Sequence, residues 1–154
     1  MVAEGIGVGV LMFIAYRAAE NRIFDAVQRA GHTDFTVAQG RIAARIGPNG
    51  TRLSDLAEQA QVAKQTATAL VDRLERAGYV ERTVDPSDAR ARLVRIDTLG
   101  EEVIRVARAE EARIEAEWTE HLGVRRMKQL REALTMLREI TDPYQGSSAA
   151  ETQP

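Results

Sequence analysis

Residues 5–30 alternate apolar and polar positions with the three-to-four spacing that places one stripe along an α-helix. Gly31 follows directly and predicts the end of this helix. Its first half, residues 5–16, is apolar nearly all round, so we expect burial on more than one side. The stripe runs through Ile6, Val10, Phe13, Arg17, Asn21, Phe24 and Val27.

A second, shorter helix is predicted to begin after Thr36. The hydroxyl of Thr36 can cap the helix, and Gln39 three residues later can reach back to the cap. Ile42 and Ile46 extend the buried stripe until Gly47-Pro48 stops it.

A short helix, a turn near residues 60–62 and a longer helix are predicted between residues 52 and 80. Apolar residues of the longer helix recur at i, i+3, i+4 and i+7, and Gly78 closes it. This order is that of a helix-turn-helix, whose second helix can lie in a major groove. The inner faces consist of Leu53, Leu56 and Ala57 in the first helix and Ala67, Leu70, Val71 and Leu74 in the second.

After residue 79 the period of the pattern falls to two. Residues 79–84 and 92–96 alternate as strands do. The segment Asp85-Pro86-Ser87-Asp88 has the composition of a turn, because Pro86 fixes its own backbone and the Asp and Ser side chains bond to nearby N–H groups. We therefore expect a β-hairpin with Arg90 and Arg92 at its tip.

Two more helices are predicted between residues 98 and 141. Thr98 and Glu101 have the spacing of a capping box, and the first of these helices runs to about His121 before Gly123 ends it. The last helix, residues 124–141, has an apolar seam suited to packing on another helix, and residues 143–154 are expected to form a disordered tail. The seam consists of Met127, Leu130, Leu134 and Leu137.

The composition narrows the function classes. The chain has 154 residues and no cysteine, which excludes thiolate catalysis, disulfides and cysteine-based metal sites and fits a reducing cytoplasm. The longest apolar run, residues 5–16, is too short to span a bilayer. The net charge is −2, but residues 63–96 carry seven cations against five acids, 7 − 5 = +2, and residues 97–120 carry three against eight, 3 − 8 = −5. An anionic partner is therefore expected to meet the middle of the chain.

Two segments carry a resemblance to a known family. "LSDLAEQAQVAKQTATALVDRLERAGYVER" (residues 53–82) and "DPSDARARLVRIDTLG" (residues 85–100) resemble the helix-turn-helix and wing of the MarR family of bacterial transcription regulators. Gln61 stands where that family often has glycine, and a left-handed backbone there costs about 1 kcal/mol. Ala67 stands where a larger branched residue is common.

The resemblance implies a mainly α fold with a small β-hairpin wing and a single MarR-like domain over residues 1–142. Residues 36–97 would form the DNA-binding winged helix, and helices 5–30 and 98–141 would make a homodimer. The resemblance also implies a repressor that a small aromatic or anionic effector releases from a pseudo-palindromic operator. It assigns Arg90 to the minor groove and Asp88 to holding Arg90 in position. No operator, regulated gene or effector follows from the sequence.

The residues themselves are consistent with DNA binding. When the inner face of the longer helix is buried, hydrogen-bonding and cationic side chains face outward, where they suit base edges and phosphates. The alternative is an ordinary solvated helix face, and for the wing a surface ion pair worth under about 1 kcal/mol. The candidate DNA-binding residues are Lys64, Gln65, Thr66, Thr68, Ala69, Arg73, Arg76, Asp88, Arg90 and Arg92.

Other functions have weaker support. His32 and His121 lie in separate segments without acids at metal-ligand spacing, so we expect no metal, no cofactor and no enzyme activity. The candidates for effector contact are Phe13, Tyr16, Arg17 and Trp118, although Trp118 is more simply a packing residue. Two alternatives stay open: a winged helix that makes only protein contacts, and a monomer in which the first and last helices pack within one chain.

Overall fold

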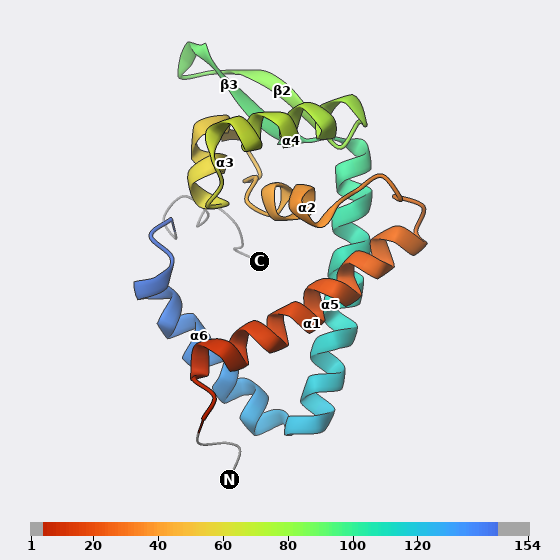
Figure 1. The fold of residues 1–154 in the computed structure, drawn as a ribbon, viewed down its shortest axis with the longest axis vertical. Coiled ribbons are helices and arrows are strands. Elements are labelled where there is room, and N and C mark those ends of the chain that lie inside the picture. Colours follow the sequence, from red (N-terminus) through yellow and green to blue (C-terminus); the bar gives the residue numbers. More distant parts are fainter. Residues whose placement is uncertain (1–4, 145–154) are drawn as a thin grey trace.

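The computed structural model, which describes residues 5–144, consists of a small lobe set on three long helices (Figure 1). The predicted fold class, mainly α with a small β wing, is confirmed. In chain order the elements are α1 (Val8–Arg29), α2 (Val37–Ala43), β1 (Thr51–Arg52), α3 (Leu53–Gln59), α4 (Lys64–Arg76), β2 (Val80–Asp85), β3 (Asp88–Ile96), α5 (Thr98–Leu122) and α6 (Val124–Thr141).

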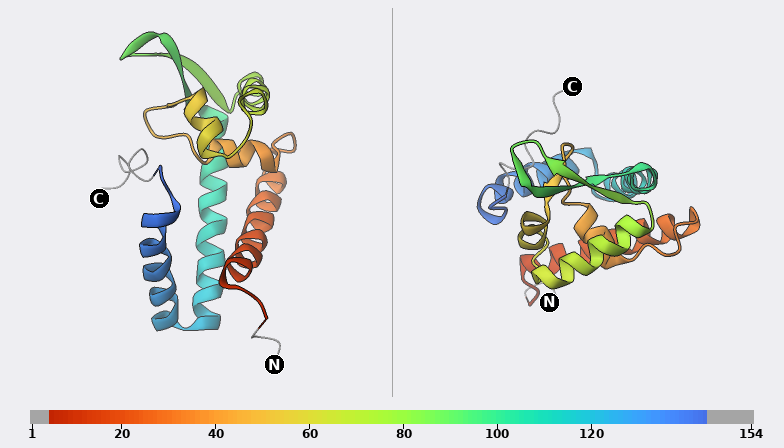
Figure 2. Two further views of the ribbon diagram at one scale, coloured as in Figure 1. Left: turned by 60° about the vertical axis from the view of Figure 1, so that its left-hand side comes forward. Right: turned by 90° about the horizontal axis from the view of Figure 1, so that it is seen from above.

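The long helices form a stem beneath the lobe. Helix α5 runs from the lobe along the long axis, and after Gly123, whose φ of 86° permits the sharp turn, α6 runs back toward the lobe while diverging from α5 (Figures 1 and 2). Helix α1 packs on the other side of α5. Arg22 of α1 binds two carboxylates of α5, that of the buried Glu110 at 3.0 Å and that of Glu117 at 3.0 Å. Arg22 thereby lowers the pKa of both glutamates.

The helix-turn-helix lies at the predicted positions. Thr36 and Gln39 cap α2 reciprocally, since the Gln39 N–H donates to Thr36 Oγ1 and the Thr36 N–H donates to Gln39 Oε1. Between α3 and α4, Gln61 adopts a φ of 57°, the left-handed conformation that glycine would take without steric cost. The predicted departure at this turn is therefore accommodated by a strained backbone.

The wing belongs to a three-stranded antiparallel sheet of order β1-β3-β2. The sequence indicated two strands, whereas Thr51 and Arg52 add a third by pairing with Val94 and Leu93 of β3. This two-residue strand connects the sheet directly to the start of α3. The sheet and the helix-turn-helix therefore form one unit.

One apolar core holds this lobe together. It joins residues of α1, α2, α3, α4, the sheet and α5, and the predicted inner-face residues Leu56, Ala67, Val71 and Leu74 are at its centre. Tyr79, between α4 and β2, packs edge-on against Phe35 and donates a hydrogen bond of 2.7 Å to Asp34. Burial, together with this carboxylate, raises the pKa of Tyr79 to about 12. The end of α4 is thus fixed to the loop that follows α1.

The start of α5 differs from the prediction. Asp97 caps this helix, because its Oδ1 accepts the Thr98 N–H at 2.7 Å and its own backbone is extended. Thr98 is already the first helical residue, so the predicted capping box of Thr98 and Glu101 is wrong by one position. Because Asp97 precedes Thr98 and its carboxylate accepts the first free N–H of the helix, Asp97 occupies the cap position and Thr98 becomes part of the first turn.

The stem leaves apolar surface uncovered. Helix α6 has no buried residue, and α1 buries only Ala26 and Val27 near its C-terminal end. Most of the predicted tail, residues 145–154, lies outside the described residues. Among residues 5–144 no helix is both long and apolar enough to cross a bilayer. The exposed apolar residues of the stem are Val8, Val10, Leu11, Phe13, Ile14 and Tyr16 in α1 and Val124, Leu130, Leu134, Met136 and Ile140 in α6.

Candidate nucleic-acid interface

The outer face of α4 carries most of the predicted contact residues. Thr68 is the partly buried member, and its hydroxyl donates to the Lys64 carbonyl at 2.9 Å. No carboxylate among residues 5–144 lies within ion-pair distance of Lys64, Arg73 or Arg76. The exposed members of this set are Lys64, Gln65, Thr66, Ala69, Arg73 and Arg76.

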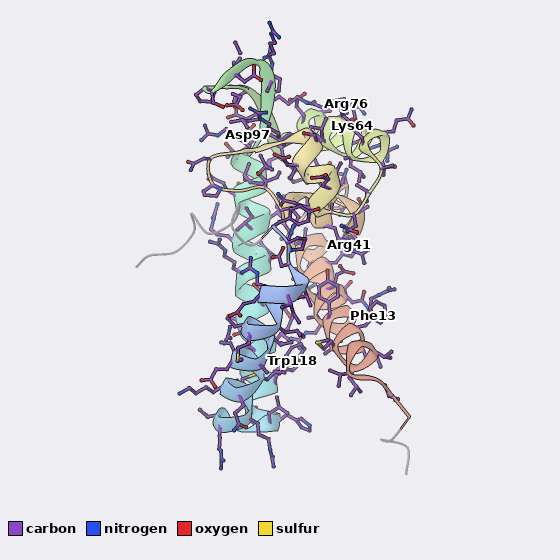
Figure 3. All side chains as sticks on the ribbon, turned by 90° about the vertical axis from the view of Figure 1, so that its left-hand side faces the viewer. Phe13, Arg41, Lys64, Arg76, Asp97 and Trp118 are labelled. Carbon is purple, nitrogen blue, oxygen red and sulfur yellow. The ribbon has the colours of Figure 1, made fainter. Side chains whose placement is uncertain are left out.

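The wing extends from the same end of the molecule as α4. Seen from above, α4 and the β2–β3 ribbon lie next to each other over the rest of the chain (Figure 2, right). Lys64 and Arg76 mark this end, whereas Phe13 and Trp118 lie in the stem (Figure 3). A single elongated partner can therefore reach α4 and the wing together.

The wing tip has an irregular register. Val84 pairs with Arg92, but the next residue of β2, Asp85, pairs with Asp88, so three residues of β3 bulge out between those two pairs. Arg90 lies in this bulge, and both Arg90 and Arg92 are exposed. Neither has an ion-pair partner in the described part of the chain. The prediction that the two arginines lie near the tip is confirmed, although β3 begins at Asp88, four residues earlier than expected.

Asp88 contacts Arg90 in a different way from the one the resemblance implied. Its Oδ1 accepts the backbone N–H of Arg90 at 3.0 Å, and no ion pair joins the carboxylate to the Arg90 guanidinium. The expectation that Asp88 orients the guanidinium is therefore not met in this structure. A carboxylate two residues before an amide closes a local turn readily, so Asp88 holds the backbone of the bulge and leaves the guanidinium free.

Asp85 anchors the turn through the kind of side-chain bond to a nearby N–H group that the sequence predicted, while its burial and its bond to Arg52 were not predicted. It is only 6% exposed, and its Oδ1 accepts both the Ser87 N–H at 2.8 Å and the Ser87 hydroxyl at 2.7 Å. Its Oδ2 accepts Arg52 Nε at 2.8 Å. These bonds, those from Ser87 foremost, lower the pKa of Asp85 to about 2. The wing turn is thereby attached to β1 at the base of α3.

The low pKa of Asp85 predicts a pH-dependent contribution to stability. An ordinary aspartate has a pKa of about 3.9, so the Asp85 carboxylate stabilises the fold in full above about pH 4, and this contribution disappears as the pH falls through about 2. We expect Asp85→Asn to lower the melting temperature at pH 7 and to match the wild type near pH 2. Melting curves of both proteins between pH 2 and 7 test this. Glu81→Gln, at an exposed position, is the control and should change little at any pH.

Arg82 is a second residue that the sequence did not single out. It lies on β2 and binds Asp72 and Glu75 of α4. Arg82 follows Asp72 and Glu75 closely in the sequence, which could have suggested that they pair. Only the angle between α4 and β2 in the structure shows that the three side chains meet.

The predicted effector residues lie on two stem helices, α1 and α5. Phe13, Tyr16 and Arg17 are exposed on α1, and Trp118 is partly buried on α5.

A cavity of about 310 Å³ lies elsewhere, between the base of the wing and the end of α6. No cluster of three or more metal-ligating side chains occurs among residues 5–144. The cavity is lined in part by Arg45, Arg52, Asp55, Asp85 and Tyr144.

Sequence comparisons relate the chain to transcription regulators. Residues 33–91 match the model of the MarR family. The HTH-type transcriptional regulator BilQ of Clostridioides difficile is 38% identical over 52 residues, and the match covers 34% of this chain and 35% of that protein. The chain therefore matches about a third of the length of this curated relative.

Solved structures extend the likeness to most of the chain. The transcriptional regulator Tm0710 of Thermotoga maritima is 29% identical, with a TM-score of 0.60 over 86% of this chain and 92% of that one. A point mutant of MepR from S. aureus, solved bound to an oligodeoxyribonucleotide, is 20% identical, with a TM-score of 0.57 over 88% of this chain and 99% of that one. The second likeness concerns the fold alone.

Proposed function

We propose that the chain is a winged-helix transcription regulator of the MarR family, whose model matches residues 33–91, and that it binds duplex DNA through α4 and the wing. The observation that carries this proposal is the set of cations on α4 and the wing tip that lack a carboxylate partner in residues 5–144. Exposed, unpaired cations at one end of a protein with net charge −2 favour a polyanion at that end. The DNA-bound MepR structure has a similar fold.

In this proposal α4 is the recognition helix. Gln65 pairs with a base edge, preferably adenine, and Thr66 and Lys64 bind phosphates near the start of the helix. The Ala69 methyl group suits a thymine methyl group. Arg73 and Arg76 bind the backbone farther along the groove.

The wing supplies the second contact. A narrow minor groove has an enhanced negative potential, which attracts an arginine inserted into it. Arg90 is proposed to enter the minor groove, with Arg92 close to the adjoining phosphates. Asp88 supports this contact by holding the backbone of the bulge, as its 3.0 Å bond to the Arg90 N–H suggests.

A homodimer is proposed to bring two such lobes to one operator. Two lobes related by a two-fold axis read half-sites about 34 Å apart, and their combined surface allows specificity that one lobe lacks. The uncovered apolar faces of α1 and α6 support the assignment of residues 5–30 and 98–141 to dimerisation. Residues 36–97 would then form the DNA-binding part of one domain, residues 1–142.

The regulator is further proposed to be a repressor that a small effector releases. A ligand between the stem and the lobe would change the separation of the two recognition helices and so weaken operator binding. Titrating aromatic and anionic compounds against an operator complex tests this step. Compounds that bind the protein and leave operator affinity unchanged would contradict it.

The deciding experiment is recovery of bound sequences from random duplex DNA, followed by affinity measurements at several salt concentrations. A pseudo-palindrome and a steep loss of affinity with added salt are expected, because phosphate contacts release counterions. A protein that retains no duplex at any salt concentration contradicts the proposal and favours a winged helix that makes only protein contacts.

Arg90→Ala should weaken operator binding by about 1–3 kcal/mol while the protein stays dimeric. The loss follows from removing an exposed guanidinium that has no other partner among the described residues. Titration of a fluorescent operator measures it, and Arg108→Ala on the exposed face of α5 is the matched control. Equal affinities of Arg90→Ala and the wild type would contradict the placement of the wing on DNA.

A further inference from the structure

Arg82 of β2 is the residue that joins the wing to α4. Its Nη2 donates to Asp72 Oδ1 at 2.6 Å, and its Nη1 donates to Glu75 Oε1 at 2.8 Å. The other oxygen of Glu75 accepts the Arg82 backbone N–H at 3.0 Å. Glu75 therefore binds both the main chain and the side chain of Arg82. These two bonds fix the position of β2 along α4.

The backbone of Arg82 is itself held firmly. Arg82 pairs with Val94 in the middle of the β2–β3 ladder, and Val94 is fully buried. The Arg82 side chain is only 24% exposed. Because the guanidinium starts from an ordered strand and reaches two carboxylates in a fork, it sets the angle between α4 and the wing.

Arg82 also determines the charge that α4 presents. Asp72 and Glu75 keep 49% and 39% of their side-chain surface exposed, on a helix with only three cations, Lys64, Arg73 and Arg76. Without Arg82, two free carboxylates would stand beside the surface proposed for DNA phosphates. Carboxylates and phosphates repel each other, so the positive charge of Arg82 between the two acids lowers the repulsion that the duplex meets on approach.

We infer that Arg82 is a positioning residue for DNA binding, which offsets part of the negative charge of Asp72 and Glu75 and holds the recognition helix and the wing in one orientation. Arg82 itself does not contact DNA in this role. The inference rests on the proposed function, because it assumes that α4 and the wing meet the same duplex.

A mutant cycle tests this role. Arg82→Met keeps much of the stem of the side chain and removes the charge, and Asp72→Asn with Glu75→Gln removes the charges of both partners. We expect Arg82→Met to weaken operator binding about tenfold in the wild-type background and by less than about threefold in the doubly neutralised background. Neutralising the acids should thus rescue most of the loss. All affinities are measured at a temperature at which each variant is folded by circular dichroism.

The outcomes separate this role from two others. A direct phosphate contact by Arg82 predicts equal losses in both backgrounds, and a purely structural role predicts no loss of affinity for the folded variant. Either result overturns the inference. Arg82→Lys, which keeps the charge but lacks the fork, should lie between Arg82→Met and the wild type. If Arg82→Met does not fold, the same comparison is made with Arg82→Lys in both backgrounds.

Thermal unfolding of the same variants without DNA gives an independent readout. The loss of melting temperature caused by Arg82→Met should be smaller when the acids are already neutralised, because the pairs then no longer exist. A coupling in unfolding together with a wild type that binds no duplex would contradict the proposed function and, with it, this role in DNA binding. A wild type that binds DNA without coupling between Arg82 and the acids would contradict the Arg82 role alone.

Discussion

Gly100→Ala is expected to lower the free energy of unfolding by about 3 kcal/mol. A Cβ at this position would lie 2.2 Å from the Tyr79 carbonyl oxygen and 2.9 Å from Cγ2 of Ile96. The first distance is far inside van der Waals contact, so either the backbone at Tyr79 or the start of α5 must move. Urea unfolding followed by circular dichroism measures the change.

Neither side of this contact can shift easily. The Tyr79 carbonyl accepts the Asp97 N–H at 3.0 Å, and the Tyr79 ring is packed against Phe35 and bonded to Asp34. The first turn of α5 is held by the Asp97 cap. The clash therefore acts on the junction where the recognition helix, the wing and the long stem helix meet.

Gly47→Ala is the control for this prediction. A Cβ there would lie 3.6 Å from Thr51 Oγ1, which is an ordinary contact, so its unfolding free energy should stay within about 0.5 kcal/mol of the wild type. Equal stability of Gly100→Ala and Gly47→Ala would mean that α5 approaches Tyr79 less closely than the structure indicates.

Helix positions were predictable because local signals agree with the final packing. The capping pair Thr36 and Gln39, the i, i+3, i+4, i+7 stripe of α4 and the terminating Gly123 each act within a few residues. The start of α5 was misplaced because two capping residues, Asp97 and Thr98, stand next to each other. Short-range rules do not decide between such neighbours, whereas the Asp97 N–H bond to Tyr79 does.

The third strand could not be predicted from local patterns. Thr51 and Arg52 form only two residues of extended chain, and their pairing depends on Val94 and Leu93, more than 40 residues later. Strand propensity carries no information over a segment this short. A separation of 33 residues likewise concealed Arg52 as a partner of Asp85.

The sequence predicted which residues form the candidate interface, but not most of the contacts that these residues make with their neighbours. The outward face of α4 and the arginines of the wing follow from periodicity and turn chemistry. The buried state of Asp85, the backbone contact of Asp88 and the link through Arg82 depend on how the turn folds back and on the angle between elements. Sequence patterns locate side chains on elements and leave the choice among several charged partners open.

Ile14→Glu is expected to convert the proposed dimer into monomers and to reduce operator affinity at least about a hundredfold. Ile14 is 54% exposed on α1, within the apolar surface that we assign to the partner subunit. An ionised carboxylate at the centre of an apolar interface loses its hydration without gaining a counter-charge, which costs several kcal/mol for each copy. Light scattering gives the mass, and operator titration gives the affinity.

The control for Ile14→Glu adds the same charge to an exposed polar position, Ser54→Glu in α3, and should leave the mass of the dimer unchanged. Because Ile14 lies outside the apolar core of the lobe, the melting curve of the Ile14→Glu monomer should keep the cooperative transition of the lobe. A dimer that tolerates glutamate at position 14 would move the contact surface away from this face of α1, toward the exposed face of α6 around Met136 and Ile140. The loss of affinity would then follow substitutions in α6, because two recognition helices bind one operator tightly only while the stem holds them at a fixed separation.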